Sequence, residues 1–256
     1  MINRRVFLSS LAVAPFAPAA ATRELKVELL WRSPDGHPNG LESTPEGLWV
    51  GEQTTDRAYL LDWKTGKVLK KVDTDSSNTS GIAYGGGYLW MSANGPAVGR
   101  GPKPTDAKSG EIIKVDPATG KTVARYPNPD GGGLHGMLYH DGSLWMTCFK
   151  WKTLAQVDAK TFQVIHQIPV QFDRSHGLGW DPPGIWCVFS NDYVIQKLDT
   201  KTGKVLDEIK LTKGKDPDPH GMDIHNGYMY YCDAGIAPGG KSNGSATGGY
   251  ICRFKM

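Results

Sequence analysis

The chain has 256 residues, of which 39% are hydrophobic and 21% charged, and it contains 32 glycines and 17 prolines. Its 29 basic and 26 acidic residues leave a formal net charge of +3, and no basic run alternates with aromatic residues. These values exclude the electrostatic footprint of a nucleic-acid-binding protein, so we expect no nucleic-acid partner. The glycine and proline content favours a chain with many turns.

Residues 1–21 have the composition of an export signal. They contain Arg4 and Arg5, then an apolar stretch, no acidic residue and small residues at every second position near residue 21. The stretch is too short, and too soon interrupted by proline, to span a bilayer. The run NRRVFLS resembles a twin-arginine signal, with an ordinary signal as the alternative. Both predict an exported protein, periplasmic or secreted, whose domain comprises residues 22–256.

The first predicted strand covers residues 25–31, LKVELLW. Leu25, Val27, Leu29 and Trp31 alternate with the intervening residues, as expected for a strand with one buried face. No partner for this strand is found nearby in the sequence.

From residue 39 onward the sequence repeats five times. Each unit begins with a residue followed by Gly and a large apolar residue, at intervals of 41, 55, 41 and 44 residues. These intervals are typical of four-stranded propeller blades. The five opening residues, here called the column, are Asn39, Ser80, His135, His176 and His220.

Each unit continues with an aromatic-containing strand and a strand–turn–strand segment. The aromatic residues fall in register at Trp49, Trp90, Trp145, Trp186 and Tyr230. Aspartates open the turns of the first four units, as in YLLDWKTGKV, because a short carboxylate can accept hydrogen bonds from nearby backbone donors. The fifth unit lacks an outermost strand. We therefore predict an all-β fold, a propeller of five four-stranded blades whose ring is closed by the N-terminal strand.

Two long insertions separate the second and third strands of their units, at residues 95–109 and 235–249. Both are rich in Gly, Pro and Ser, and the topology places both at the face that carries the column. Loops on a rigid scaffold often recognise ligands, so we expect lids there. The candidate substrate-binding residues of this face, besides Asn39 and Ser80, are Arg100, Lys150, Trp151 and Arg174. Solvated loop cations are the alternative interpretation.

Four cysteines stand in a chain with a predicted export signal, which allows disulfides. Cys232 and Cys252 lie on neighbouring predicted strands, so they could face each other across a hairpin. Cys148 and Cys187 lie on second strands of adjacent blades with mismatched positions. The disulfide state of all four stays open.

The column predicts a chemical centre at the mouth of the channel. Because the first and second strands are antiparallel, the residue thirteen positions after each column residue is expected to face it, which pairs Asn39 with Glu52 and His220 with Asp233. Ring closure makes the first and fifth blades neighbours, so these two acids are expected to lie close together. Three imidazoles in one column are unlikely to arise by chance among seven histidines.

Three neutral imidazoles, His135, His176 and His220, form a ligand set suited to zinc, with one open position for a substrate. Glu52 or Asp233 would then complete the sphere or act as a base. A harder ion, magnesium or calcium, would instead prefer Glu52, Asp233 and Asn39. A structural alternative is that each histidine bonds the backbone of the next blade and is repeated with it.

The strands GLWVGEQ and YMYYCDAG resemble the blade motif of virginiamycin B (streptogramin) lyase-like propellers, and the likeness covers the whole mature chain. Gluconolactonase-like and NHL-repeat propellers share these motifs. The lyase resemblance implies a histidine base at the start of an inner strand and a magnesium-assisted acid on the next strand, which His220 and Asp233 match in position. That family has more blades, and its acid is Glu.

Two further groups of propeller enzymes each resemble this chain in one feature. Peptidylamidoglycolate lyase holds zinc with three channel histidines, a role that His135, His176 and His220 resemble. The plant and bacterial glutaminyl cyclases have five blades, but HPNGLESTPEG does not match their opening motif.

These features predict a metal-dependent lyase or hydrolase that acts on a small cyclic ester, lactone or peptide-like molecule. His220, Asp233 and Glu52 are its candidate catalytic residues. A monomer acting on a small-molecule substrate is expected. The alternative is a propeller that binds a ligand or partner without catalysis, with glutaminyl cyclisation third.

Overall fold

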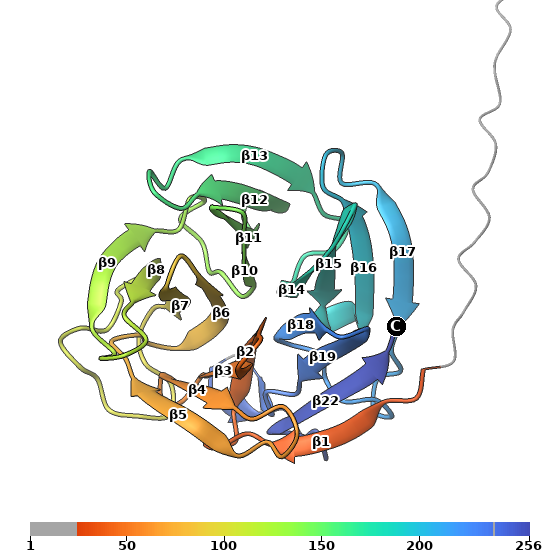
Figure 1. Cartoon of the computed structure of the whole chain (residues 1–256), viewed down its shortest axis with the longest axis horizontal. Coiled ribbons are helices and arrows are strands. Elements are labelled where there is room, and N and C mark those ends of the chain that lie inside the picture. Colours follow the sequence, from red (N-terminus) through yellow and green to blue (C-terminus); the bar gives the residue numbers. More distant parts are fainter. Residues whose placement is uncertain (1–24, 238) are drawn as a thin grey trace, which may run out of the picture.

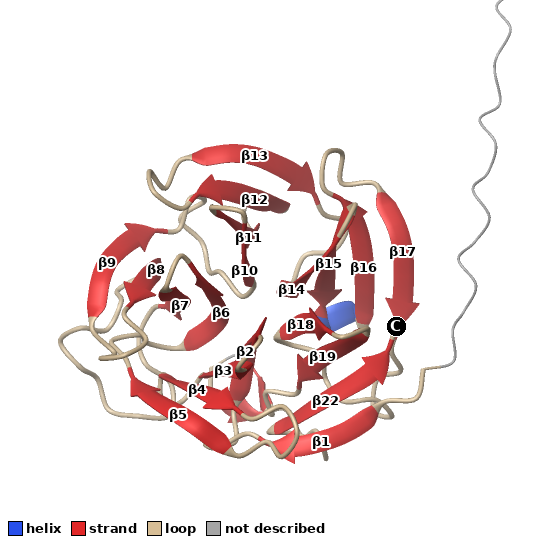
Figure 2. Ribbon diagram, viewed as in Figure 1, coloured by secondary structure: helices blue, strands red, loops and turns tan. Residues whose placement is uncertain are grey.

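Five four-stranded antiparallel sheets stand as blades around a central axis in the computed structural model of the chain (Figure 1). The structure describes residues 25–237 and 239–256, so the predicted export signal and the predicted boundary at residue 22 lie outside the described residues. Strands make up nearly all of its regular structure (Figure 2). Within the described ranges, no helix is long and apolar enough to cross a membrane.

The first four blades each run outward from the channel in chain order. Blade one contains β2 (Pro38–Thr44), β3 (Gly47–Glu52), β4 (Arg57–Leu61) and β5 (Val68–Asp73). Blade two contains β6 (Thr79–Gly85), β7 (Tyr88–Asn94), β8 (Gly110–Val115) and β9 (Thr122–Pro127). Blade three contains β10 (Met137–His140), β11 (Ser143–Cys148), β12 (Thr153–Asp158) and β13 (Val164–Pro169). Blade four contains β14 (Ser175–Asp181), β15 (Gly184–Phe189), β16 (Val194–Asp199) and β17 (Val205–Lys210).

The fifth blade is completed by the start of the chain, as predicted. It contains β18 (Met222–His225), β19 (Tyr228–Cys232), β22 (Tyr250–Lys255) and, outermost, β1 (Glu28–Arg32). The pairing of β1 with β22 is antiparallel, and Arg253 Nε donates to Glu28 Oε2 at 2.9 Å. The five-bladed fold and its closure by the N-terminal strand are therefore confirmed. Two short strands, β20 (Ile236–Ala237) and β21 (Lys241–Ser242), lie in the second insertion, and a 3₁₀ turn, η1 (Ser190–Asp192), follows β15.

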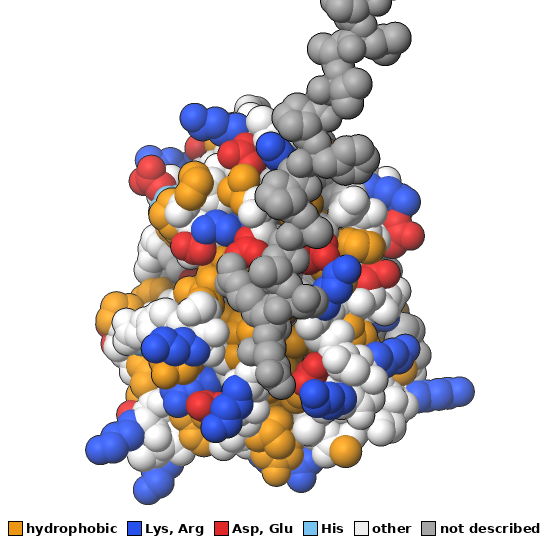
Figure 3. Space-filling view, turned by 90° about the vertical axis from the view of Figure 1, so that its right-hand side faces the viewer, with side chains coloured by type: hydrophobic (Ala, Val, Ile, Leu, Met, Phe, Trp, Pro, Cys, Tyr) orange, Lys and Arg blue, Asp and Glu red, His pale blue; other side chains and the backbone are white. Residues whose placement is uncertain are grey.

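The aromatic residues that the repeat aligns each pack against the following blade. Trp49, Trp90, Trp145 and Trp186 are almost fully buried, and Tyr230 completes the ring. Each lies in a separate hydrophobic cluster formed with the next blade, Tyr230 with blade one. The core is therefore divided into five layers between blades. On the face that Figure 3 shows, basic and acidic side chains are interspersed with hydrophobic ones.

The glycine after each column residue allows neighbouring inner strands to touch. A Cβ added at Gly136 would overlap the carbonyl of His176, and one at Gly221 would lie 2.7 Å from the carbonyl oxygen of Asn39. The same contact with the next blade's backbone occurs at the other three positions, Gly40, Gly81 and Gly177. The recurrent glycine is thus explained by close approach of backbones around the channel.

We expect Gly136→Ala to destabilise the fold by about 2 kcal/mol or more, because its Cβ has backbone atoms on the facing side that cannot move aside. Gly101→Ala is the matched control, since nothing lies within 4 Å of its added Cβ. Urea unfolding measures both changes. Equal midpoints for the two variants would contradict the close-approach explanation.

The disulfide between Cys232 and Cys252 that the sequence left open is not formed in this structure, where all four cysteines are free and buried. Cys232 lies opposite Ile251, and Cys252 lies opposite Tyr231. The two cysteines are therefore one step out of register and point to opposite faces of the sheet. They accordingly pack in different hydrophobic clusters.

Two buried carboxyl groups lie on neighbouring inner strands, Glu42 on β2 and Asp223 on β18. Burial raises the pKa of Asp223 to about 6, although the hydroxyl and backbone N–H of Ser43 both donate to it at 2.6 Å. Burial, and secondly the charge of Asp223, raise the pKa of Glu42 well above its ordinary value. The folded state therefore holds these protons more tightly than the unfolded state does.

The protonated forms of Glu42 and Asp223 should therefore stabilise the folded state. We expect this contribution to the free energy of unfolding to be present at pH 4 and to be lost as the pH rises through about 6. Glu42→Gln removes one ionisable partner, so the variant should lose less stability between pH 5 and pH 8 than the wild type, by on the order of 1 kcal/mol. Denaturant unfolding at several pH values measures the difference. Parallel pH profiles for the two proteins would refute it.

Candidate functional site

The structure brings the three column histidines together at one end of the channel. The ring centroids of His135 and His176 are 4.4 Å apart, and those of His176 and His220 are 4.7 Å apart. Both contacts are edge-to-face, with His176 in the middle. His176 and His220 are buried, whereas His135 is partly exposed and stacks on Phe149.

All three imidazoles are held neutral by their surroundings. Burial, then the charge of Arg174 and the neighbouring His220, lower the pKa of His135 to about 3. Burial and the adjacent imidazoles lower the pKa of His176 well below its ordinary value. Burial also lowers the pKa of His220, but there the charges of Asp218 and Asp233 act in the opposite direction. His220 is thus the one member of the trio whose protonated form is stabilised by carboxylates.

The hydrogen bonds of the trio define which nitrogen atoms are available. His220 Nδ1 lies 3.3 Å from the carbonyl oxygen of Asp218. Since a carbonyl only accepts, Nδ1 carries the proton and Nε2 keeps its lone pair. Arg174 Nε donates to His176 Nε2 at 3.2 Å, and Ser80 Oγ lies 3.0 Å from His135 Nδ1.

This arrangement does not fit the predicted metal. The Nε2 lone pair of His176 accepts from the Arg174 guanidinium, so this nitrogen is not open to a metal ion. Across the described ranges, no three or more His, Cys, Asp or Glu side chains are placed to hold a metal ion. A divalent metal, whether Zn, Mg or Ca, stays a prediction from the sequence.

The two acids expected at the channel mouth instead hold connecting segments. Glu52 is fully buried, accepts from the hydroxyl of Ser33, and accepts from the backbone N–H of His37 at 2.9 Å. It ties down the segment that enters blade one. Neither Glu52 nor Asp233 lines the cavities described below.

Asp233 organises the second insertion from within. Its carboxylate accepts from Ser245 Oγ at 2.5 Å, from Thr247 Oγ1 at 2.8 Å and from the backbone N–H of Gly235 at 2.9 Å. It also accepts from the backbone N–H of Asp218 at 3.2 Å. Asp233 therefore fixes both the insertion and the residue two positions before His220.

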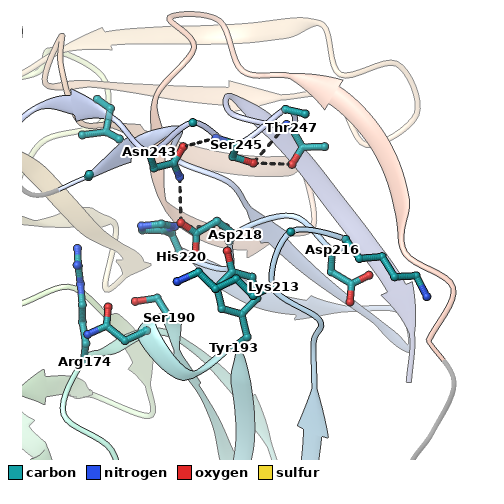
Figure 4. Close-up of a pocket in the computed structure, with 17 residues that line it drawn as sticks. Arg174, Ser190, Tyr193, Lys213, Asp216, Asp218, His220, Asn243, Ser245 and Thr247 are labelled. Carbon is teal, nitrogen blue, oxygen red and sulfur yellow. Dashed lines mark hydrogen bonds between the residues drawn. The ribbon is translucent and has the colours of Figure 1, made fainter.

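Two cavities lie beside the histidines. The inner cavity, of about 300 Å³, is lined by Asn39, Gln53, Asn78, Val98, His135, Phe149, Arg174, His220, Ile236, Ala237, Gly239 and Gly240. The outer cavity, of about 650 Å³, lies between blades four and five, with Arg174, Asp218 and His220 in its wall (Figure 4). Arg174, His220, Ile236 and Ala237 line both.

The two insertions meet beside the inner cavity, and their role as lids stays a prediction. A Cβ added at Gly240 would overlap the side chain of Val98, and both residues line the cavity. Arg100 anchors the first insertion, because its guanidinium donates to Asp56 and Asp106, both at 2.6 Å. Its donors are used in this network, and Arg100 lines neither cavity.

The other predicted substrate contacts divide into two groups. Asn39 and Arg174 line the inner cavity, and Asn39 Oδ1 is buried with no hydrogen-bond partner. Lys150 and Trp151 line neither cavity; Lys150 Nζ donates to the carbonyl of Gly131 at 2.7 Å.

Sequence reasoning missed Asp218, Ser190 and Tyr193, which line the outer cavity. The run DPDPH, which places two aspartates just before His220, is the signal that could have identified Asp218. Ser190 and Tyr193 stand at the turn after β15, and nothing in their spacing marks them.

Comparisons with known proteins were made for the whole chain. No protein-family model matches it, and no curated protein matches it in sequence. Among solved structures, a glutaminyl cyclase from Myxococcus xanthus matches with a TM-score of 0.65 and 11% identity, over 90% of this chain and 96% of the cyclase. The chain shares the cyclase's propeller fold.

Virginiamycin B lyase from Staphylococcus aureus matches with a TM-score of 0.50 and 16% identity, over 88% of this chain and 68% of the lyase. The predicted resemblance to virginiamycin B lyase-like propellers is confirmed for the fold. At such identities these likenesses show the fold alone.

We expect Asp233→Ala to loosen the second insertion, because five hydrogen bonds lose their acceptor. Trypsin should then cut after the exposed Lys241 several-fold faster, which mass spectrometry of the fragments measures. Asp199→Ala is the control, since Asp199 serves a hairpin turn in blade four. An unchanged cutting rate at Lys241 would show that Asp233 does not hold the insertion.

Proposed function

We propose that this propeller is an enzyme, a lyase or hydrolase that acts on a small ester, lactone or peptide-like carbonyl compound at the channel mouth. One observation carries the proposal: a neutral imidazole with a free Nε2, His220, and a partly buried guanidinium, Arg174, line the same two cavities. A base and a fixed positive charge are the two groups that carbonyl chemistry requires.

His220 is proposed as the proton acceptor rather than its neighbours. Protonation of His135 or His176 would place a positive charge beside Arg174 with no carboxylate to offset it. Protonation of His220 is helped by the charge of Asp218. A general base works best when its pKa lies near the operating pH, and His220 comes nearest to this condition among the three.

Arg174 is proposed to bind the negative oxygen of the substrate. Its Nε is bonded to His176, and within the described part of the chain no acid forms an ion pair with its guanidinium. In a hydrolysis, His220 Nε2 would accept a proton from the attacking water while the carbonyl oxygen gained charge beside Arg174. In an elimination, His220 would remove the proton from the carbon next to the carbonyl, and the enolate oxygen would lie beside Arg174. The enolate would then form the C=C bond as the bond from the β-carbon to the leaving oxygen breaks.

Glutaminyl cyclisation is the second candidate. The structural match to the Myxococcus xanthus cyclase covers almost the whole length of both chains, and this chain has five blades. Cyclisation also needs a base and a group that stabilises a carbonyl oxygen. A propeller that binds a ligand without turnover remains the alternative of a different class. The export of the protein stays a prediction from residues 1–21.

The test is turnover of a panel containing a lactone, a cyclic depsipeptide, a linear ester and a peptide with N-terminal glutamine. We expect His220→Ala to lower turnover of the accepted substrate by about 100-fold or more, the usual contribution of a positioned base. The wild-type rate should fall as the pH falls through a pKa below 6.5, because only neutral His220 accepts a proton. Asp218→Asn should move this acid limb to still lower pH.

His225→Gln is the matched control for the loss of an imidazole, since His225 lies off the column and stacks on Trp63. Its turnover should equal that of the wild type. Unchanged turnover in His220→Ala would remove His220 as the base. A panel in which no member is consumed would support the non-catalytic alternative.

A further inference from the structure

The outer cavity contains charges of both signs. Arg174, Lys213 and Lys215 line it together with Asp216 and Asp218. Apolar lining comes from Ile236, Ala237, Ala246 and the ring of Tyr193. A cavity of about 650 Å³ lies in the size range of small-molecule sites, and this one is marked by charge rather than by hydrophobic surface.

Arg174 and Asp218 interact without neutralising each other. The charge of Asp218 acts on Arg174, whose pKa burial lowers, so the two groups are close enough to interact. Within residues 25–237 and 239–256, however, no ion pair involves either side chain. In Figure 4, the two side chains come from different segments, Arg174 at the lower left and Asp218 near the centre of the view.

Asp218 is held in place by neutral groups. Asn243 Nδ2 donates to its Oδ2 at 2.9 Å, and its backbone N–H donates to Asp233. Burial and the nearby charges of Asp218 and Asp233 raise the pKa of the Tyr193 hydroxyl to about 12. The carboxylate is therefore positioned, and among the described residues no cation forms an ion pair with it.

A buried hydroxyl without a partner lies in the wall of the same cavity. Ser190 is 4% exposed, and its Oγ makes no hydrogen bond in the structure. Buried polar atoms are usually satisfied, so an orphan in a cavity wall indicates a group that a ligand supplies.

We propose that the outer cavity binds a zwitterionic ligand of the amino-acid type, a free amino acid or a short peptide, whose carboxylate contacts Arg174 and whose ammonium group contacts Asp218. The inference rests on the proposed function. It narrows the substrate to the peptide-like class with free ends, and it assigns the terminal amino groups of Arg174 to the ligand carboxylate. A guanidinium suits a carboxylate because it can donate two parallel hydrogen bonds.

The mixed charge also excludes simpler ligands. A dianion that satisfied Arg174 would face Asp216 and Asp218, and a dication would face Arg174 and the two lysines. Each would leave one set of charges repelled or unpaired. A ligand with one charge of each sign satisfies both walls of the cavity.

The experiment uses calorimetric titration of the protein with alanine and with alanylalanine in four forms: free, N-acetylated, C-amidated and blocked at both ends. We expect the free form of the preferred probe to bind about tenfold or more tightly than either singly blocked form, because each block removes one charge-assisted contact. The doubly blocked form should bind most weakly. This series needs no variant, so it decides the proposal even if a variant fails to fold.

Two variants assign the contacts. Asp218→Asn should remove the difference between the free and N-acetylated forms, and Arg174→Gln should remove that between the free and C-amidated forms. The controls Lys71→Gln and Asp73→Asn remove the same charges from β5, outside the cavity, and should bind as the wild type does.

Equal binding of all four forms by the wild type, or no binding of either free probe, would overturn the proposal. His220→Ala separates it from the proposed chemistry, since this variant should still bind the free probe. If His220→Ala loses turnover of the panel substrate but still binds the free probe, both proposals are supported. If the wild type turns over a panel substrate but binds all four forms of the probe equally, only the ligand class is overturned.

Discussion

Close backbone contact between neighbouring inner strands is the constraint on which the site depends. Five positions of the repeat hold glycine. At each of them the next blade's backbone occupies the space that a side chain would need, as at Gly136 against His176. The residue before each glycine is therefore held at the mouth of the channel, close to its counterpart in the next blade. This packing allows the imidazole centroids to lie 4.4 and 4.7 Å apart.

Such crowding determines the electrostatics of the channel mouth. Three largely enclosed rings, with His176 in contact with both neighbours, cannot all carry a proton, so desolvation and mutual repulsion keep them neutral. The positive charge of the site then comes from Arg174, which does not titrate in the physiological range. The neutral proton acceptor and the permanent cation belong to different parts of the fold. The acceptor is an imidazole of the column, whereas Arg174 lies in the loop before β14.

The sequence predicted the fold well because its signals are local and repeated. Aromatic residues at one position of every unit, the glycine after each column residue and an unpartnered N-terminal strand define blade number and closure without any long-range geometry. Register was harder to predict. Irregularities shift the pairing near the starts of three inner strands, β2, β6 and β14, so a fixed offset of thirteen residues does not place a side chain toward the channel. A one-step shift likewise separates Cys232 from Cys252.

The orientation of Glu52 and Asp233, away from the cavities, has a second physical cause. A buried carboxylate needs hydrogen-bond donors, and loop backbones supply them, so Glu52 and Asp233 turn toward the segments that they fasten. Asp233 fastens the backbone of Asp218, and Asp218 then brings a carboxylate to the cavity beside His220. The residue that sequence analysis assigned to chemistry thus positions a residue that lines the outer cavity. Loop residues such as Asp218 have no repeat to align them, so their place follows only from the folded loop.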